Sequence, residues 1–268
     1  MFLAKNRAVV LVKYSVFIPY YNSFTWLDIT SWYSTRIDPK IKVDEIFEFN
    51  SETTESNKKL VMANLSVIND FLSETEEKSL VDEIEPYMKR LRYQYDHWDH
   101  AIHGFRETER LKWNESNSII LNKIKSIAFG NDLTLPHTHI LDLAENGYIK
   151  PHIDSIRFCG NTIAGASLLS DSVMRFCNDK NQFTFSALLK RRSLYIMRYG
   201  HTYAFYFIIK YIFYFIIIIS RGPIRYDFSH EILSNDVSSF QGNKIVKTRR
   251  VSVICRSRPE PTTEENPQ

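Results

Sequence analysis

The sequence contains few cysteines, and their number and spacing exclude a disulfide framework. Cys159, Cys177 and Cys255 form an odd-numbered set within 268 residues, and their spacing matches no zinc site. Disulfide-stabilised domains and zinc modules carry paired cysteines at short, regular separations. We therefore expect three reduced thiols that serve as packing residues in a protein that is not secreted.

The chain also has little net charge. It carries 34 Lys and Arg against 31 Asp and Glu, which gives a formal charge of +3. This balance argues neither for nor against a nucleic-acid partner, for which a basic patch on one face would be the better evidence. Hydrophobic residues make up 44% of the chain, enough for one substantial core. We therefore expect one folded domain with irregular ends.

Acidic residues are missing from the first 27 positions. This stretch holds Lys5, Arg7 and Lys13 among hydroxyl-bearing and aromatic residues, a composition typical of transit peptides. Its apolar run is too short for a secretory signal, and no small-residue cleavage site follows. An ordinary disordered extension is the alternative. Residues 1–59 are accordingly assigned to a mitochondrial transit-like and disordered region, which ends in a polar, acidic linker over residues 49–59.

Two helices are expected before the chain becomes rich in strands. Ser73 and Glu76 form a capping-box pattern, in which a hydroxyl and a carboxylate satisfy free backbone amides of the first turn. Apolar residues then follow at helical spacing, at Leu80, Ile84, Met88 and Leu91. Pro86 is expected to kink or split this helix. A second helix is predicted over residues 115–127, with Gly130 as its stop, and both helices should pack against a sheet.

From residue 139 onward, hydrophobicity alternates with a period of two, which predicts strands. Asn146 and Gly147 provide the turn chemistry of a hairpin. Further strands are predicted over 162–169, 173–176, 183–189, 193–197, 225–229 and 248–257. Many short strands with turns between them indicate a sandwich or a double-stranded barrel of the jelly-roll kind. The predicted fold is mainly β, with helices covering one face.

Two candidate metal ligands lie in the segment 147–155. His152 and Asp154 are two residues apart, and side chains at this spacing share a face in a strand. An imidazole and a carboxylate on one face supply two-thirds of the facial triad that holds non-haem Fe(II) and leaves coordination positions open. What this pair lacks is a second histidine.

A second His-x-Asp pair, His97 and Asp99, is a rival metal site within the histidine-rich segment 95–106. No predicted hairpin flanks the rival pair, and no suitably spaced pair of arginines follows it at the expected distance. Tripeptides of this kind are weak evidence without a fitting structural context. We expect the segment to be a loop that borders the active site, with a solvated polar loop as the alternative.

The missing histidine is best supplied by His230, which is followed by a predicted strand carrying Arg250 and Arg256. The two arginines are separated by an even number of residues, so in an extended strand they share a face. Two guanidiniums beside a metal suit a dicarboxylate, because each can form charge-assisted bonds to a carboxylate. Taken singly, a core histidine and solvated arginines would be the simpler interpretations. The combination is what indicates a site.

In order and spacing, His152-x-Asp154, His230 and the pair Arg250 and Arg256 resemble the AlkB branch of Fe(II) and 2-oxoglutarate dioxygenases. The local sequence is most similar to the mitochondrial part of this branch over residues 95–109, 147–172, 193–198 and 226–233. The resemblance covers residues 60–258, which are therefore expected to form the dioxygenase domain, with a disordered tail over 259–268.

This resemblance implies an α+β fold built on a double-stranded β-helix, the jelly roll. The implied Fe(II) ligands are His152, Asp154 and His230. Arg256 would meet the metal-proximal carboxylate of 2-oxoglutarate, Arg250 would meet the distal one, and Tyr195 would add a hydroxyl bond. The resemblance also implies O2 as a cosubstrate, a monomer in the mitochondrial matrix, and roles in fatty acid metabolism and programmed necrosis.

The prime substrate is left open by the sequence. A basic and aromatic platform for nucleic acid would use the residues Arg90, Arg92, Tyr93, Tyr95 and Trp98. We favour the interpretation that these residues form the outer face of a helix and its following loop, because no groove or fold-specific motif is visible. A protein, a mitochondrial RNA and a small molecule remain candidates. A hypothesis of another class is a catalytically silent jelly-roll protein that acts by binding partners.

Residues 199–221 depart from the family pattern. Their centre, residues 203–219, is apolar except for Lys210, and its 17 residues are at the lower limit for a membrane span. A span here would divide one barrel between Tyr195 and His230, so we expect no stable span; an integral membrane protein is a weaker alternative. Removing these 23 residues shortens the separation of His152 and His230 from 78 to 55. We predict an insertion without a chemical role, such as a retained intron.

Overall fold

A computed structural model describes residues 43–95, 101–178, 180, 183–198 and 224–259. The expectations for the N-terminal 42 residues, for the rival pair His97 and Asp99, for the insertion 199–221 and for residues 260–268 lie outside this part of the chain. Within the described ranges, no helix is both long enough and apolar enough to cross a bilayer.

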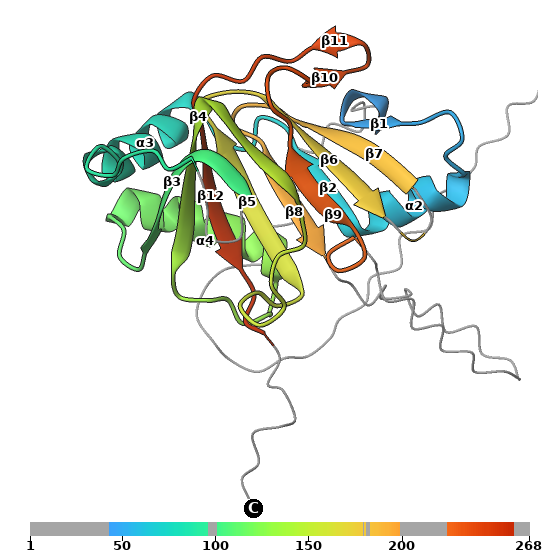
Figure 1. The fold of residues 1–268 in the computed structure, drawn as a ribbon. Coiled ribbons are helices and arrows are strands. Elements are labelled where there is room, and N and C mark those ends of the chain that lie inside the picture. Colours follow the sequence, from blue (N-terminus) through green and yellow to red (C-terminus); the bar gives the residue numbers. More distant parts are fainter. Residues whose placement is uncertain (1–42, 96–100, 179, 181–182, 199–223, 260–268) are drawn as a thin grey trace, which may run out of the picture. The chain divides into compact units, whose positions relative to one another are not determined.

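A curled antiparallel sheet of ten strands forms most of the fold (Figure 1). Its strands are β1 (Phe47–Phe49), β2 (Leu65–Ile68), β3 (Ile102–Arg110), β4 (Thr138–His152), β5 (Thr162–Leu168), β6 (Ser172–Asn178), β7 (Phe183–Leu189), β8 (Leu194–Arg198), β9 (Ser229–Ile232) and β12 (Arg250–Arg256). They run in the order β1-β7-β6-β9-β4-β12-β5-β8-β2, and β3 pairs with β4. The strands β10 (Ser239–Phe240) and β11 (Asn243–Lys244) form a separate pair. This architecture confirms the predicted mainly β, jelly-roll fold.

The predicted hairpin turn at Asn146 and Gly147 is wrong, because β4 runs through it. The first part of β4 pairs with β12, the last part with β9, and β3 lies along both, with a register shift between His103 and Phe105. Gly104 has a φ of 63°, and a Cβ on Gly147 would lie 2.4 Å from the Gly104 carbonyl oxygen. Residues 144–147 therefore form a bulge that needs glycine on both strands.

Lys247 holds this bulge from the loop before β12. Its side chain is 1% exposed, and its Nζ donates to the carbonyl oxygens of Ala144 at 2.9 Å and Glu145 at 2.8 Å. Asn235 adds a bond from Nδ2 to the Glu145 carbonyl oxygen at 3.1 Å. The bulge thus has buried donors for carbonyls that the sheet ladder leaves free.

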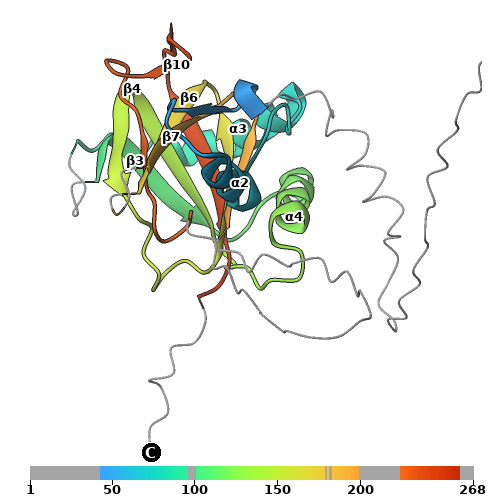
Figure 2. The ribbon, with the colours of Figure 1, turned by 90° about the vertical axis from the view of Figure 1, so that its right-hand side faces the viewer.

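Three helices, α2 (Glu55–Asn64), α3 (Glu74–Met88) and α4 (Glu115–Phe129), lie on one side of the sheet (Figure 2), and the short 3-10 helix η1 (Val43–Glu45) precedes β1. The capping box of Ser73 and Glu76 is confirmed at the start of α3. Pro86 does not split this helix, because it lies in the last turn. Leu91 lies beyond the helix and is 38% exposed. Gly130 ends α4 with a φ of 57°, as predicted.

A buried charged cluster joins α3 to the sheet. Asp142 in β4 is 0% exposed and accepts hydrogen bonds from Arg106 Nε in β3 at 2.7 Å and from Arg249 Nη2 at 2.9 Å. Arg249 Nη2 also lies 2.7 Å from Glu85 Oε2 in α3. Tyr93 donates to Asp142 at 3.1 Å, so this residue belongs to the interior network and not to an exposed platform.

Two predicted boundaries are wrong. The folded domain begins before residue 60, because Phe47 in β1 pairs with Ala187 in β7 and α2 occupies most of the expected linker. The expected loop over residues 95–106 becomes strand β3 from Ile102 onward. The strands predicted over 162–169, 173–176, 183–189, 193–197 and 248–257 are confirmed as β5, β6, β7, β8 and β12, whereas that over 225–229 starts four residues later, as β9.

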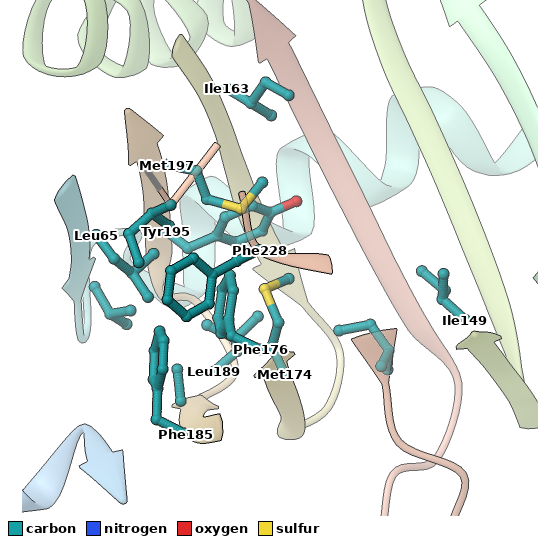
Figure 3. Close-up of a cluster of buried hydrophobic side chains, with 14 of the residues drawn as sticks. Leu65, Ile149, Ile163, Met174, Phe176, Phe185, Leu189, Tyr195, Met197 and Phe228 are labelled. Carbon is teal, nitrogen blue, oxygen red and sulfur yellow. The ribbon is translucent and has the colours of Figure 1, made fainter. Parts of the chain in front are cut away.

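A large cluster of buried apolar side chains is contributed by several strands of the sheet (Figure 3). Its centre is aromatic: the rings of Phe176 and Phe185 stack at 4.7 Å, and Phe228 contacts Phe185 edge-on at 5.8 Å. The Phe176 ring also lies 6.0 Å from the His230 ring. All three cysteines are reduced thiols, as expected, and Cys159 and Cys255 are buried. The core therefore reaches the candidate site directly.

Candidate metal and cosubstrate site

His152, Asp154 and His230 come together, although 78 positions separate the two histidines in the chain. His152 ends β4 and pairs directly with His230 in β9. One ligand atom from each of the three residues lies within 4.8 Å of the others. His152 Nε2 is 3.9 Å from Asp154 Oδ1, and His230 Nε2 is 3.6 Å from Asp154 Oδ2. The donor set is that of a 2-His-1-carboxylate facial triad.

Hydrogen bonding orients the first histidine for metal binding. His152 Nδ1 lies 2.9 Å from the Lys150 carbonyl oxygen, which can only accept a hydrogen bond. The Nδ1 atom therefore carries the proton, and the Nε2 atom that faces Asp154 carries the lone pair. Such a bond from the second ring nitrogen is the usual support of a metal-binding histidine.

The electrostatics of the site favour a neutral imidazole at His230 and an ionised carboxylate at Asp154. Burial lowers the pKa of His230 to about 4, and the positive charge of His152 acts in the same direction. Burial alone would raise the pKa of Asp154, but the positive charges of His230, His152 and Arg225 outweigh it, so the pKa is lowered. At neutral pH His230 and Asp154 can therefore bind a cation without first losing a proton.

Arg225 supports the loop that carries Asp154, and sequence reasoning did not identify it. This arginine is 2% exposed. Its Nη1 donates to the Asp154 carbonyl oxygen at 2.8 Å, and its Nη2 donates to the Cys159 carbonyl oxygen at 3.3 Å. The guanidinium thereby fixes both ends of the loop between β4 and β5. No periodic pattern surrounds Arg225, so only its contacts show this role.

One face of β12 lines the same cavity as the metal group. The cavity has a volume of about 890 Å³ and is bordered by Arg250, Ser252, Ile254 and Arg256 together with Tyr195. Val251, Val253 and Cys255 alternate with these residues and are buried on the other face. The two predicted arginines therefore do share a face, and this face is directed toward the candidate metal ligands.

Three buried polar atoms on this face lack a hydrogen-bond partner in the described part of the chain: Arg250 Nη2, Ser252 Oγ and Arg256 Nε. Leaving such a group unsatisfied costs about 1–3 kcal/mol, so their concentration in one cavity indicates a polar ligand. Ser252 was missed by sequence reasoning, although its position between the two arginines and on the same face was a usable signal.

Tyr195 in β8 lies opposite Gly165 in β5, and the glycine makes room for its ring. A Cβ on Gly165 would lie 2.4 Å from Tyr195 Oη. The tyrosine is 4% exposed. Burial raises the pKa of Tyr195, against the opposing positive charge of Arg250. Its hydroxyl is therefore protonated at neutral pH and can donate a hydrogen bond into the cavity.

Sequence comparison finds curated relatives that share most of this chain. They are alpha-ketoglutarate-dependent dioxygenase alkB homolog 7, mitochondrial, of Bos taurus, 48% identical over 192 residues, and the protein of the same name of Mus musculus, 46% identical over 192 residues. Each alignment covers 71% of this chain and 76% of the relative. No protein-family model matches the sequence.

Solved structures with a similar arrangement include OsALKBH1 and a prolyl-4-hydroxylase of Pseudomonas putida. The first is 10% identical with a TM-score of 0.46, over 72% of this chain and 98% of that structure. The second is 11% identical with a TM-score of 0.49, over 76% of this chain and 97% of that structure.

Proposed function

Because this chain belongs to the AlkB family of 2-oxoglutarate-dependent dioxygenases, as mitochondrial alkB homolog 7 does, we propose that His152, Asp154 and His230 bind its Fe(II). The convergence of their ligand atoms within 4.8 Å supports this assignment. His230 offers a neutral nitrogen donor because its pKa is lowered, and Asp154 offers a carboxylate whose pKa is also lowered. When bound, the ion supplies open coordination positions at which the cosubstrate and O2 react.

We assign the anchoring of 2-oxoglutarate to β12 and Tyr195. The observation that carries this assignment is the set of three buried, unsatisfied polar atoms on one face of β12. Following the family resemblance, Arg256 meets the carboxylate nearer the metal, and Arg250 with Tyr195 meets the distal one. Arg250 is held for this task because its Nε donates to Ser167 Oγ at 3.1 Å. Ser252 Oγ is a further polar contact.

The protein contributes orientation and exclusion of water to the reaction. Arg225 keeps the Asp154 loop in place, the β12 arginines fix both ends of a dicarboxylate, and the aromatic core packs against His230. The overall reaction converts 2-oxoglutarate and O2 into succinate and CO2 while a C–H bond of the prime substrate is hydroxylated. Hydroxylation of a carbon attached to nitrogen leads to loss of formaldehyde and thus to demethylation.

The chain is mitochondrial, in agreement with its first 27 residues, which lack acids, and with the mitochondrial designation of both relatives. We propose that it acts in the matrix as a monomer, on a protein, an RNA or a small molecule. By family resemblance, this activity would serve fatty acid metabolism and programmed necrosis. For the domain arrangement we propose a transit-like N-terminal region, a dioxygenase domain that begins near Val43, and a disordered tail from residue 259.

Release of succinate tests the enzymatic function. The purified full-length chain and a variant without residues 199–221, supplied with Fe(II), O2 and 2-oxoglutarate, are expected to form succinate even without a prime substrate. His152→Ala should reduce this release to the level of buffer, because one metal ligand is lost. Succinate formation equal to that of His152→Ala would instead favour a silent jelly-roll protein that acts by binding partners.

The inserted segment is tested at the level of the transcript. In the sequence, residues 199–221 lie between β8 and β9, and both of these strands contribute residues to the site. Sequencing of messenger RNA across codons 190–230 is expected to reveal a form without these 23 codons. Finding only the long form would contradict the retained-intron hypothesis.

A further inference from the structure

A second histidine of β4, His139, connects β3 to β12, the strand that carries the two arginines proposed to anchor the cosubstrate. His139 pairs with Ile254 in β12 and with Glu109 in β3, so Arg256 and Glu107 are its diagonal neighbours on the two adjacent strands. His139 Nε2 lies 2.9 Å from Glu107 Oε2, and His139 Nδ1 lies 2.5 Å from Arg256 Nη2. All three side chains line the cavity of the metal group.

The two partners determine the protonation of the His139 ring. A guanidinium has only donors, so Nδ1 must accept the bond from Arg256. An ionised carboxylate has only acceptors, so Nε2 must carry the proton and donate to Glu107. His139 is therefore a neutral imidazole in one defined tautomer, and Glu107 selects this tautomer.

A neutral partner has a particular consequence for Arg256. A carboxylate that could pair with this guanidinium is Glu109, whose Oε1 lies 4.0 Å from Arg256 Nη1. A close pair with Glu109 would neutralise the arginine, whereas the bond to His139 holds the arginine without removing its positive charge. The Nε of Arg256 stays without a partner in the described residues and can bind a ligand.

We propose that His139, oriented by Glu107, is a positioning residue that holds Arg256 away from Glu109 and directed toward a carboxylate of 2-oxoglutarate. This inference rests on the proposed function of Arg256. It predicts a loss of cosubstrate affinity, and not of metal affinity or folding, when His139 can no longer accept a hydrogen bond.

The test compares His139→Phe, which removes the acceptor, with His139→Asn, whose amide oxygen can replace Nδ1 as an acceptor. His137→Phe is the matched control, because His137 is an exposed histidine two positions earlier. Calorimetry of the metal-free protein gives the Kd for Mn(II), calorimetry of the Mn(II)-loaded protein gives the Kd for the cosubstrate, and uncoupled succinate release gives KM and kcat. His139→Phe should raise both the Kd and the KM for the cosubstrate about tenfold, the effect of losing one hydrogen bond to a charged group.

Three further results are expected. In His139→Phe, Mn(II) affinity and kcat should change less than twofold, and His139→Asn should keep most of the cosubstrate affinity. Adding Glu109→Gln to His139→Phe should recover part of that affinity, because the competing carboxylate is gone. The reference variant Arg256→Met should weaken 2-oxoglutarate binding at least as much as His139→Phe.

The inference is overturned if His139→Phe leaves the Kd for the cosubstrate within twofold while Arg256→Met weakens binding. It is also overturned if cosubstrate affinity, metal affinity and thermal stability fall together without recovery in His139→Asn. An Arg256→Met variant that binds 2-oxoglutarate normally would instead reject the proposed role of Arg256 itself.

Discussion

At the scale of single residues, the site depends on side chains that contact neither the metal nor the cosubstrate but orient the residues proposed to do so. The metal group has its ligands at the end of one strand, in a loop and on a second strand, and the loop ligand Asp154 is the least constrained by the sheet. Arg225 compensates for this through two backbone carbonyls of the loop. A buried arginine is costly to desolvate, so its presence beside Asp154 is best explained by the geometry that it maintains.

Replacing Arg225 should therefore lower metal affinity. In Arg225→Met the apolar stem remains, but the bonds to Asp154 and Cys159 are lost, and we expect Mn(II) affinity to fall about 10- to 100-fold, as for other groups that orient metal ligands. Calorimetric titration with Mn(II) measures this change. Arg175→Met is a control, since Arg175 is partly exposed and pairs with Glu231 at 2.6 Å. Equal metal affinity in both variants would show that the loop needs no arginine.

At the scale of elements, the bulge in β4 lets one strand serve two parts of the sheet. Before the bulge, β4 pairs with β12 and carries His139; after it, β4 pairs with β9 and carries His152. The relative placement of the proposed cosubstrate arginines and the proposed metal ligands thus depends on residues 144–147. Lys247 is the buried group that fixes these residues.

The ionisation of Lys247 makes a prediction about pH. Burial lowers its pKa from 10.5 to about 8, with the positive charge of Arg250 acting in the same direction. Between these values the unfolded chain binds more protons than the folded one, so this lysine makes unfolding costlier as pH rises from 8 to 10.5. The free energy of unfolding of the native chain minus that of Lys247→Met should therefore increase across this window.

Urea unfolding at pH 7.5, 8.5 and 9.5 measures that difference. At pH 7.5 we also expect Lys247→Met to change stability by about 1–3 kcal/mol, because two buried carbonyls lose a donor while an ammonium is no longer desolvated. The sign of the stability change at pH 7.5 depends on which of these two effects is larger. The increase of the difference with pH does not depend on that balance. A difference that stays constant from pH 7.5 to 9.5 would contradict the lowered pKa.

At the scale of the whole molecule, the folded domain includes a segment that its composition assigns to a linker. The aromatic rings of β1 pack on Phe185 in the core: the ring centroid of Phe185 lies 6.3 Å from that of Phe47 and 5.8 Å from that of Phe49. β1 also forms the edge of the ten-stranded sheet. Residues 43–59 therefore belong to the same folded unit as the metal site.

Truncation tests this boundary. A chain that begins at residue 60 loses β1 and half of α2, and we expect it to be less stable than a chain that begins at residue 43 by about 3–5 kcal/mol, the cost of removing one or more core aromatic side chains. Thermal and urea unfolding of the two chains provide the comparison. Equal stability would place the boundary at residue 60 after all.

Local patterns determined a large part of this protein. Alternation over β7 and β12, the capping box at Ser73 and the stop at Gly130 depend on interactions within a few residues, which the sequence states directly. The even separation of Arg250 and Arg256 placed this pair on one face of β12 by the same local geometry, whereas Asp154 lies in the loop after β4 and not in the strand that its spacing from His152 predicted. Their order along the chain then indicated the family.

Tertiary structure alone decided what depends on distant partners. Asn146 and Gly147 have turn chemistry, but the continuing partner strand with Gly104 makes them a bulge. β1 is a strand because it pairs with β7, which lies more than a hundred residues away. The local sequence around Arg225, Glu107 and His139 does not indicate their partners, and only their contacts reveal what they hold. Hydrogen bonds and burial between remote segments are properties of the folded chain, so these roles become visible only in three dimensions.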